Sequence, residues 1–423
     1  MAKKTTAKKE GQLPDPLKMM QKIDENIEVL QDSVYSKIDD YISSGIHILD
    51  CMCTGSAVNG GIPSSRCTVL TGDPGTGKTY LACSFVREAQ KKNYYCLWLD
   101  SEGAMDNEFM ARLGIDTSKV MIKQVSTVLE TSQVIINLCK QLEDQEEEYG
   151  EHHKFMIVLD SLGNLTTDSE RDNTMAGENK RDLKRAQDVK AHFRVIATPI
   201  ARMKIPYICI SHQYASIGSY IQNSVVSGGS GVNYNSSLTI ELTASKLSDK
   251  DNDNAASKAA GSDDLVKTGV LVTARPKKSR FTIPRKVRFQ IPFFKKPNPY
   301  VGLDSYLGDW NLSGVCRGSL LTEKEYNKLS EAEKAKIHIF EYNRETMYCQ
   351  PKDTARGIVV RHLGKTVPLT EFFTDEVFTP EYLAEIDEKI LKPTFKLPSA
   401  DAFDDIKEIE DIIEIGENTE NDE

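Results

Sequence analysis

The segment that most constrains this 423-residue chain is Gly72-Asp-Pro-Gly-Thr-Gly-Lys-Thr79. It follows an apolar run that ends at Leu70 and precedes a helical pattern that starts at Tyr80. Glycines in such a loop let backbone N–H groups turn toward phosphate oxygens, and the N-terminus of the following helix adds its positive dipole end. The sequence therefore predicts a strand, a phosphate-binding loop and a helix in direct succession.

ATP and a magnesium ion are the ligands that this loop predicts. Lys78 is expected to reach the β- and γ-phosphates, and the hydroxyl of Thr79 to ligate Mg²⁺. The apolar run Phe155–Leu159 ends in Asp160, which is interpreted as the second magnesium ligand; a helix cap at the strand end is the alternative. The ATP-binding residues predicted within the loop are Gly72, Asp73, Pro74, Gly75, Thr76, Gly77, Lys78 and Thr79.

Short apolar runs alternate with helical patterns through the middle of the chain. Helical patterns cover residues 80–89 and 131–142. This alternation is typical of an α/β protein with a mostly parallel sheet covered by helices on both faces. The predicted strands are Cys67–Leu70, Tyr95–Leu99, Phe155–Leu159, Tyr207–Ile210 and Leu238–Leu242, with Gly269–Ala274 and Val287–Ile291 extending one edge.

Shifts in composition divide the chain into four predicted regions. Residues 1–42 hold a basic arm and then an amphipathic pattern from Asp15 to Val34, which predicts a helix that packs on its own core or on a neighbouring subunit. Residues 43–311 are predicted to form the core, and residues 312–395 a small α+β domain. Residues 396–423 are predicted to be a disordered acidic tail.

The acidic tail accounts for the net charge of −10. From Asp401 to Glu423 there are eleven acidic residues and one lysine, so the rest of the chain is neutral overall. Such a tail is typical of a solvated, disordered segment. The sharper hypothesis is that it competes with nucleic acid for basic surfaces of the same chain.

Cysteine usage and hydropathy predict a cytoplasmic protein. The nine cysteines are scattered and several lie within apolar runs, which suits reduced core thiols better than a disulfide framework. No apolar run reaches the about 18 residues that indicate a membrane-spanning helix. The basic N-terminus lacks the apolar stretch of a secretory signal. Cys51-Met-Cys53 and His152-His153 lack the further ligands of a metal site.

Two acidic residues follow the predicted strand at Tyr95–Leu99. They are Asp100 and Glu102, spaced by one residue. A carboxylate at the carboxyl edge of a parallel sheet, beside a phosphate-binding loop, is placed to activate an attacking water. Solvated loop acids are the alternative.

The residues that follow resemble a known family. Leu99-Asp-Ser-Glu-Gly-Ala-Met-Asp-Asn-Glu-Phe-Met-Ala-Arg-Leu-Gly-Ile-Asp116 closely resembles the stretch of the RecA family that joins an acid, Glu, Ala, Asp, an aromatic residue and Leu-Gly-Val-Asp. Ser44–Asp50 and Gly60–Arg66 resemble the family's approach to the loop, and Asp160-Ser-Leu162 its magnesium strand. The resemblance covers roughly residues 35–310. The acidic tail, the size and the N-terminal helical pattern resemble those of a bacterial or bacteriophage strand-exchange recombinase. Divergence from the bacterial consensus and the Asp73-Pro-Gly-Thr76 of the loop favour the bacteriophage type.

The resemblance implies roles for particular residues. Glu102 takes the position of the catalytic glutamate, and Phe109 that of the aromatic residue, usually Tyr, which stacks on adenine. In Ile210-Ser-His-Gln213, Gln213 takes the position of a γ-phosphate sensor, preceded by His where bacterial proteins often carry Asn. Lys278 and Arg280 resemble paired basic residues that reach the ATP of the adjacent subunit, although bacterial proteins have Lys at the second position.

Two segments are predicted to contact DNA. One is basic and follows Asp160; the other, after Gln213, mixes aromatic and aliphatic residues with small polar ones. Basic side chains suit phosphates and apolar ones can lie between bases, whereas a solvated helix face and a surface loop are the alternatives. The predicted DNA-binding residues are Met175, Lys180, Arg181, Arg185, Tyr214, Ile217, Tyr220, Gly228 and Gly229.

The resemblance implies an ATP-dependent DNA recombinase that acts in recombination and repair. Its expected partners are single-stranded DNA, duplex DNA and further copies of the chain in a helical filament. A recombination mediator and a single-stranded DNA-binding protein are further candidate partners, and no membrane is expected. Two rival hypotheses remain: a hexameric DNA helicase with the same core, and a regulatory oligomer that uses ATP only to assemble.

Overall fold

The computed structural model describes residues 15–25, 27–33, 35, 38–175, 185–215, 224–226, 236–246, 269–293 and 295–397. Its centre is a nine-stranded sheet with the order β11-β10-β9-β3-β7-β6-β4-β5, with β8 paired to β7 alone. The strands are β3 (Cys67–Gly72), β4 (Tyr95–Asp100), β5 (Val120–Gln124), β6 (Phe155–Asp160), β7 (Tyr207–Ala215), β8 (Ser224–Val226), β9 (Leu238–Lys246), β10 (Gly269–Ser279) and β11 (Val287–Pro292).

The strands from β9 to β5 run parallel, whereas β10 and β11 are antiparallel and close one edge. The predicted α/β class and the seven predicted strand positions are therefore confirmed. The helices of this part of the chain are α2 (His47–Thr54), α3 (Lys78–Gln90), α4 (Asn107–Arg112), α5 (Val128–Tyr149), α6 (Asp168–Met175) and α7 (Arg185–Arg202), and a two-stranded ribbon pairs β1 (Tyr41–Ile42) with β2 (Ile62–Pro63).

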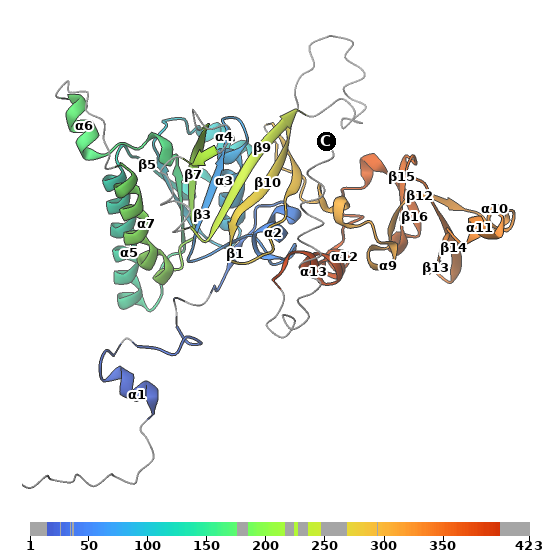
Figure 1. The fold of residues 1–423 in the computed structure, drawn as a ribbon, viewed down its shortest axis with the longest axis horizontal. Coiled ribbons are helices and arrows are strands. Elements are labelled where there is room, and N and C mark those ends of the chain that lie inside the picture. The colour runs from blue at the N-terminus through green and yellow to red at the C-terminus, as the bar shows by residue number, and fades with distance from the viewer. Residues whose placement is uncertain are drawn as a thin grey trace, which may run out of the picture.

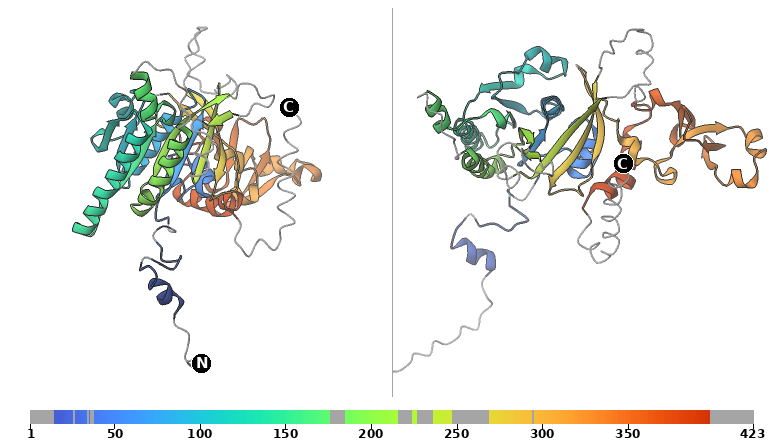
Figure 2. Two further views of the ribbon diagram at one scale, coloured as in Figure 1. Left: turned by 60° about the vertical axis from the view of Figure 1, so that its left-hand side comes forward. Right: turned by 45° about the horizontal axis from the view of Figure 1, so that its top comes forward.

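Successive strand residues face two separate hydrophobic layers, as the pleat of a strand requires. In β3, Val69 packs with the layer beneath α5 and α7, while Leu70 packs with the layer beneath α2 and α3. Figures 1 and 2 show α5 and α7 side by side on one face of the sheet. Because both faces are covered, the central strands are almost wholly buried.

The chain beyond the core forms a second, antiparallel sheet with the order β13-β14-β12-β15-β16. Figure 1 shows this sheet on the side of the core opposite α5 and α7. Its strands are β12 (Val315–Leu321), β13 (His338–Tyr342), β14 (Glu345–Pro351), β15 (Gly357–Val360) and β16 (Lys365–Pro368), preceded by α9 (Trp310–Ser313) and interrupted by α10 (Glu323–Asn327) and α11 (Glu331–Lys334).

The last described helices return to the core. α12 (Pro380–Ile386), a π-helical turn and α13 (Lys392–Phe395) bury apolar side chains in the same layer as α2 and α3. The buried carboxylate of Asp387 accepts hydrogen bonds from Ser56 Oγ at 2.7 Å and from the backbone N–H of Ala57 at 2.6 Å. The division at residue 312 stays a prediction, and residues 380–395 share the hydrophobic layer of the core.

The N-terminal prediction of one helix from Asp15 to Val34 is wrong. α1 covers only Pro16–Gln21 and is followed by turns, while Val34 lies outside the described residues. α1 buries none of its residues, and Ile23 and Leu30 are largely exposed. A helix whose apolar face packs on no described part of the chain gains little beyond its weak intrinsic propensity, which explains why the pattern does not extend the helix.

A buried hydrogen-bonded network crosses the layer beneath α5 and α7. His192 Nδ1 lies 2.8 Å from Ser132 Oγ, and its Nε2 lies 3.0 Å from the hydroxyl of Tyr207. Burial lowers the pKa of His192 from its ordinary 6.5 to about 4. The imidazole is therefore neutral in the folded protein at neutral pH.

We predict that His192 makes the protein less stable as the pH falls from about 6.5 to about 4. In this window the unfolded chain binds a proton at residue 192 that the folded chain does not, which removes up to about 3 kcal/mol from the free energy of unfolding. Urea unfolding at several pH values measures how the free energy of unfolding depends on pH. His192→Gln should flatten the dependence, whereas His153→Gln, at an exposed position, should leave it unchanged. Equal slopes in all three proteins contradict the assignment.

Candidate nucleotide-hydrolysis site

The phosphate-binding loop joins β3 to α3, as the motif predicts. Gly72 and Gly77 both have positive φ, at 150° and 88°. A Cβ on Gly72 would lie 2.3 Å from the carbonyl oxygen of Leu242, and one on Gly77 would lie 2.4 Å from Cδ1 of Ile291. Glycine is therefore required at both positions, and α3 starts directly after Gly77 with its N-terminus at the loop.

Lys78 lies inside this loop. Its Nζ donates to the carbonyl oxygens of Gly72 at 2.9 Å and Asp73 at 2.8 Å. Burial lowers the pKa of Lys78, and the negative charges of Asp160, Glu102 and Asp73 act in the opposite direction. The ammonium group is held in the concave face of the loop, where phosphate oxygens are its natural partners.

Thr79 and Asp160 fit a magnesium ion. Thr79 Oγ1 lies 2.8 Å from Asp160 Oδ2, so two oxygen ligands from α3 and β6 converge. Burial raises the pKa of Asp160 to about 6, although the hydrogen bond from Thr79 opposes this, and no Lys or Arg among the described residues forms an ion pair with it. A buried carboxylate beside a hydroxyl is the hard oxygen donor set that Mg²⁺ prefers.

The two acids after β4 have different surroundings. Asp100 is buried and accepts hydrogen bonds from the backbone N–H groups of Glu102 and Gly103 at 2.9 and 2.8 Å, and from Gln124 Nε2 at 2.9 Å. Glu102 is partly exposed, and its side chain faces Lys78, Ser161 and His212. Asp100 therefore holds the loop, and Glu102 is the acid available for chemistry.

The loop residues and Glu102 line one cavity of about 370 Å³ at the carboxyl ends of the parallel strands. Its lining includes the polar side chains of Lys78, Thr79, Glu102 and Asp160. It also includes the aromatic ring of Phe109 from α4 and residues 291–293 at the end of β11. A lining with both charged and aromatic side chains suits a phosphate chain joined to a planar base. The lining residues are Pro74, Gly75, Gly77, Lys78, Thr79, Tyr80, Glu102, Phe109, Asp160, Ile210, His212, Val270, Ile291, Pro292 and Phe293.

Lys278 and Arg280 lie at the other end of the sheet. Lys278 pairs with Thr239 of β9, which pairs with Val69, whereas the phosphate-binding loop begins at Gly72. At about 3.3 Å per residue, Lys278 is roughly 10 Å behind the loop along the strands and two strands away. Arg280 follows β10 and lies close enough to Arg66, before β3, to contribute to the lowered pKa of Arg66, after the larger effect of burial. The basic pair does not line its own chain's cavity.

The predicted DNA-binding residues are only partly described. Met175 is 83% exposed at the end of α6, which projects from the core in Figure 1. Arg185, at the start of α7, donates to the carbonyl oxygens of Leu162 and Gly163. Tyr214 pairs with Val225 through the backbone, as does Gln213 with Val226. Lys180, Arg181, Ile217, Tyr220, Gly228 and Gly229 lie outside the described residues, as does the acidic tail from residue 398 onward.

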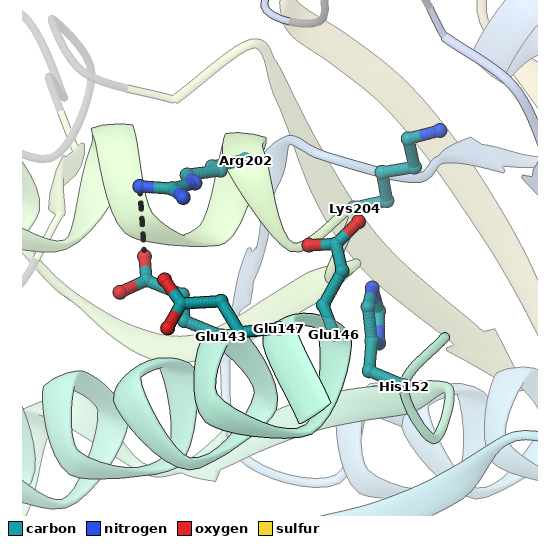
Figure 3. Close-up of a pocket in the computed structure, with 6 residues that line it drawn as sticks. All are labelled: Glu143, Glu146, Glu147, His152, Arg202 and Lys204. Carbon is teal, nitrogen blue, oxygen red and sulfur yellow. Dashed lines mark ion pairs between the residues drawn. The ribbon is translucent and has the colours of Figure 1, made fainter. Parts of the chain in front are cut away.

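A second hollow of about 400 Å³ lies at the amino ends of β6 and β7. Figure 3 shows Arg202 directed at Glu143, at 3.5 Å, while Glu146, Glu147, His152 and Lys204 complete the lining. The ammonium group of Lys204 pairs with Asp39. Within the described part of the chain no three His, Cys, Asp or Glu side chains gather as a metal site. No described helix is long and apolar enough to span a membrane.

Comparison with known proteins identifies the fold. A family model described as the RecA N-terminal domain matches residues 18–278. The chain belongs to the RecA family. The match includes the phosphate-binding loop, Glu102, Phe109, Asp160 and Lys278, whereas Arg280 and the lining residues 291–293 lie beyond its end.

Individual relatives are distant. The Recombination and repair protein of Enterobacteria phage T4 is 25% identical over 212 residues, which is 50% of this chain and 52% of that protein. Protein RecA of Wolinella succinogenes is 26% identical over 237 residues, 52% of this chain and 64% of that protein. Protein RecA of Wolbachia pipientis is 28% identical over 227 residues, which is 53% of this chain and 59% of that protein. The chain thus spans about half the length of the phage relative.

Sequence analysis assigned no role to His212, which the structure brings into the cavity. Its Nε2 lies 2.9 Å from Glu102 Oε1, although 110 residues separate the two. Ser161, which follows Asp160, donates to the same oxygen at 2.8 Å. The available signal was a polar residue at the carboxyl end of a strand, where Asp160 and Glu102 also lie.

We predict that isosteric amides at the two acids after β4 differ strongly in their effect on ATP hydrolysis: Glu102→Gln lowers kcat, whereas Asp100→Asn changes it little. Asp100→Asn should keep kcat within about threefold, because its carboxamide oxygen still accepts both backbone N–H groups and the Gln124 amide can turn. Asp100→Ala should lower kcat about tenfold or more, since the loop loses three hydrogen bonds. Steady-state hydrolysis measures both. An Asp100→Asn protein as impaired as Glu102→Gln would reverse the assignment of the two acids.

Proposed function

We propose that this chain is an ATP-dependent recombinase that assembles on single-stranded DNA and catalyses homologous pairing and strand exchange. One observation carries the proposal most strongly. Lys78, Glu102 and Asp160 share one cavity, whereas the basic pair lies at the opposite end of the same sheet. A head-to-tail stack of subunits brings the second group to the first, and a heterologous contact that does not close generates a helical filament.

Hydrolysis in this proposal uses the residues of the cavity. Glu102 accepts a proton from the attacking water, whose oxygen forms a bond to the γ-phosphorus while the bond to the β-phosphate bridging oxygen breaks. Lys78 stabilises the phosphate charge, and Phe109 stacks on the adenine. Thr79 and Asp160 would hold a magnesium ion, which would supply further positive charge at the phosphates.

Gln213 and the DNA segments complete the proposal. Gln213 is in β7, next to His212 and shortly before the predicted DNA-contacting residues Ile217 and Tyr220. A contact between Gln213 and the γ-phosphate therefore links nucleotide state to DNA binding through one strand. Reduced free thiols suit the cytoplasm as the place of action. A recombination mediator and a single-stranded DNA-binding protein are proposed as further partners.

We predict that substitutions at Lys78 and Glu102 separate binding from hydrolysis. Lys78→Ala should abolish tight ATP binding, because the loop loses its cation for the phosphates. Glu102→Gln should retain binding and lower DNA-stimulated kcat by about 100-fold or more, the typical contribution of a general base. A fluorescent ATP analogue and phosphate release measure the two steps. Wild-type turnover by Glu102→Gln removes this residue from the catalytic role.

A subunit-mixing experiment tests whether the basic pair acts on a neighbour. The double variant Lys278→Ala, Arg280→Ala should bind ATP but lose DNA-stimulated hydrolysis. Mixed with Glu102→Gln at equal amounts, it should regain activity, because roughly a quarter of head-to-tail interfaces then combine an intact Glu102 with an intact basic pair. Lys277→Ala is the matched control, since Lys277 already pairs with Glu241 at 3.0 Å.

Two outcomes of that mixing are decisive. Recovered hydrolysis in the mixture supports an active site shared between subunits. No recovery at any ratio, with co-assembly of the two variants demonstrated, contradicts it and indicates that the basic pair acts within its own chain.

A further inference from the structure

One oxygen of the proposed catalytic carboxylate is held by two donors from different strands. Glu102 Oε1 accepts a hydrogen bond from Ser161 Oγ at 2.8 Å and lies 2.9 Å from His212 Nε2. Ser161 follows β6 and His212 belongs to β7. The other oxygen, Oε2, accepts no hydrogen bond from the described residues. The two oxygens of Glu102 therefore have different surroundings.

The geometry also fixes which ring nitrogen of His212 carries the proton. A carboxylate oxygen only accepts hydrogen bonds, so Nε2 must carry the hydrogen. His212 Nδ1 is buried and finds no partner among the described residues. The Nε2–H tautomer leaves a lone pair at this buried position and avoids an unpaired N–H. The imidazole is thus a directional donor aimed at Glu102.

His212 lies on a central strand of the sheet. Its backbone pairs with that of Gly72, the first residue of the phosphate-binding loop, in the parallel ladder of β7 and β3. The side chains of His212 and Glu102 are 22% and 29% exposed, so water competes only partly for their hydrogen bond. A donor on a central strand holds its acceptor more firmly than a donor on a loop.

We propose that His212 is a positioning residue for hydrolysis: its Nε2–H fixes Oε1 of Glu102 and leaves Oε2 to accept the proton of the attacking water. This inference rests on the proposed role of Glu102 as general base and adds a residue to it. A carboxylate held by the serine alone can rotate about its side-chain torsions. Two donors from adjacent strands restrict it to one orientation, which lowers the entropic part of the barrier.

The ionisation of Glu102 is consistent with this role. Burial acts to raise the pKa of Glu102, but the hydrogen bonds from His212 and Ser161, with the charge of Lys78, outweigh it and lower the pKa overall. Loss of the imidazole donor therefore has two effects. The carboxylate becomes less ordered, and its pKa rises.

Two substitutions with different hydrogen-bonding ability test the proposal. His212→Leu fills the space without a donor, and His212→Gln places an amide N–H near the position of Nε2. With single-stranded DNA present, His212→Leu should lower kcat about tenfold to hundredfold, the effect of losing a hydrogen bond to a charged group. Its KM for ATP should stay within about twofold, because the lost contact is to Glu102 and not to phosphate. His212→Gln should recover most of kcat.

The pH dependence of kcat separates the positioning role from a purely structural one, because a purely structural role of His212 would leave it unchanged. In His212→Leu the acid limb of kcat should shift to higher pH, since Glu102 protonates more readily without its donor. Binding of a fluorescent ATP analogue reports whether each variant is folded.

The outcomes distinguish this proposal from the one on which it rests. Unchanged kcat in His212→Leu, or equal losses in His212→Leu and His212→Gln, overturn the positioning role while the ATPase assignment stands. A wild-type protein that shows no DNA-stimulated ATP hydrolysis overturns the proposed function, and the positioning role with it.

Discussion

The register of four neighbouring parallel strands determines the whole nucleotide site. In this register Gly72 pairs with His212, and Asp100 pairs with Asp160. The carboxyl ends of β3, β7, β6 and β4 therefore lie side by side, and the residues that follow β4 and β6 hydrogen-bond to each other. Ser101 Oγ, for example, donates to the carbonyl oxygen of Ser161 at 2.7 Å and accepts from its backbone N–H at 2.8 Å. A slip of one residue in any of these pairs would turn the site residues to the wrong face.

The same sheet separates the site from the basic pair. In a parallel sheet the carboxyl ends of the strands lie on one side and the amino ends on the other. Antiparallel β10 returns the chain from the carboxyl ends, where the cavity lies, to the amino ends. Val270, near the start of β10, lines the cavity, whereas Lys278, near its end, does not. A strand of eleven residues is long enough to cross the sheet, so its two ends serve different surfaces of the molecule. This geometry places the proposed catalytic carboxylate, Glu102, at one end of the sheet and the basic pair at the other.

Local patterns predicted much of this from the sequence. The phosphate-binding loop, the strand ending at Asp160 and the acid at Glu102 depend on neighbours within a few residues, and each lies where the pattern indicates. The contact between His212 and Glu102 depends on which strands are adjacent, which no local pattern specifies. The hydrogen bond between Ser56 and Asp387 joins residues 331 positions apart in the sequence, and no local pattern could predict it either. The prediction of one long N-terminal helix was wrong for the converse reason. Its amphipathic pattern is local, but no described part of the chain buries α1 or the large apolar side chains of Ile23 and Leu30 after it.

The central claim is that a complete active site forms only between two subunits. Cryo-electron microscopy of the protein on single-stranded DNA, with Mg²⁺ and a slowly hydrolysed ATP analogue, tests it most directly. The account predicts an open helical filament in which Lys78 of one subunit and Lys278 and Arg280 of the next contact the same γ-phosphate, with Glu102 of the first subunit beside the position of the attacking water. A closed ring, or a filament in which the basic pair lies away from every nucleotide, would contradict it.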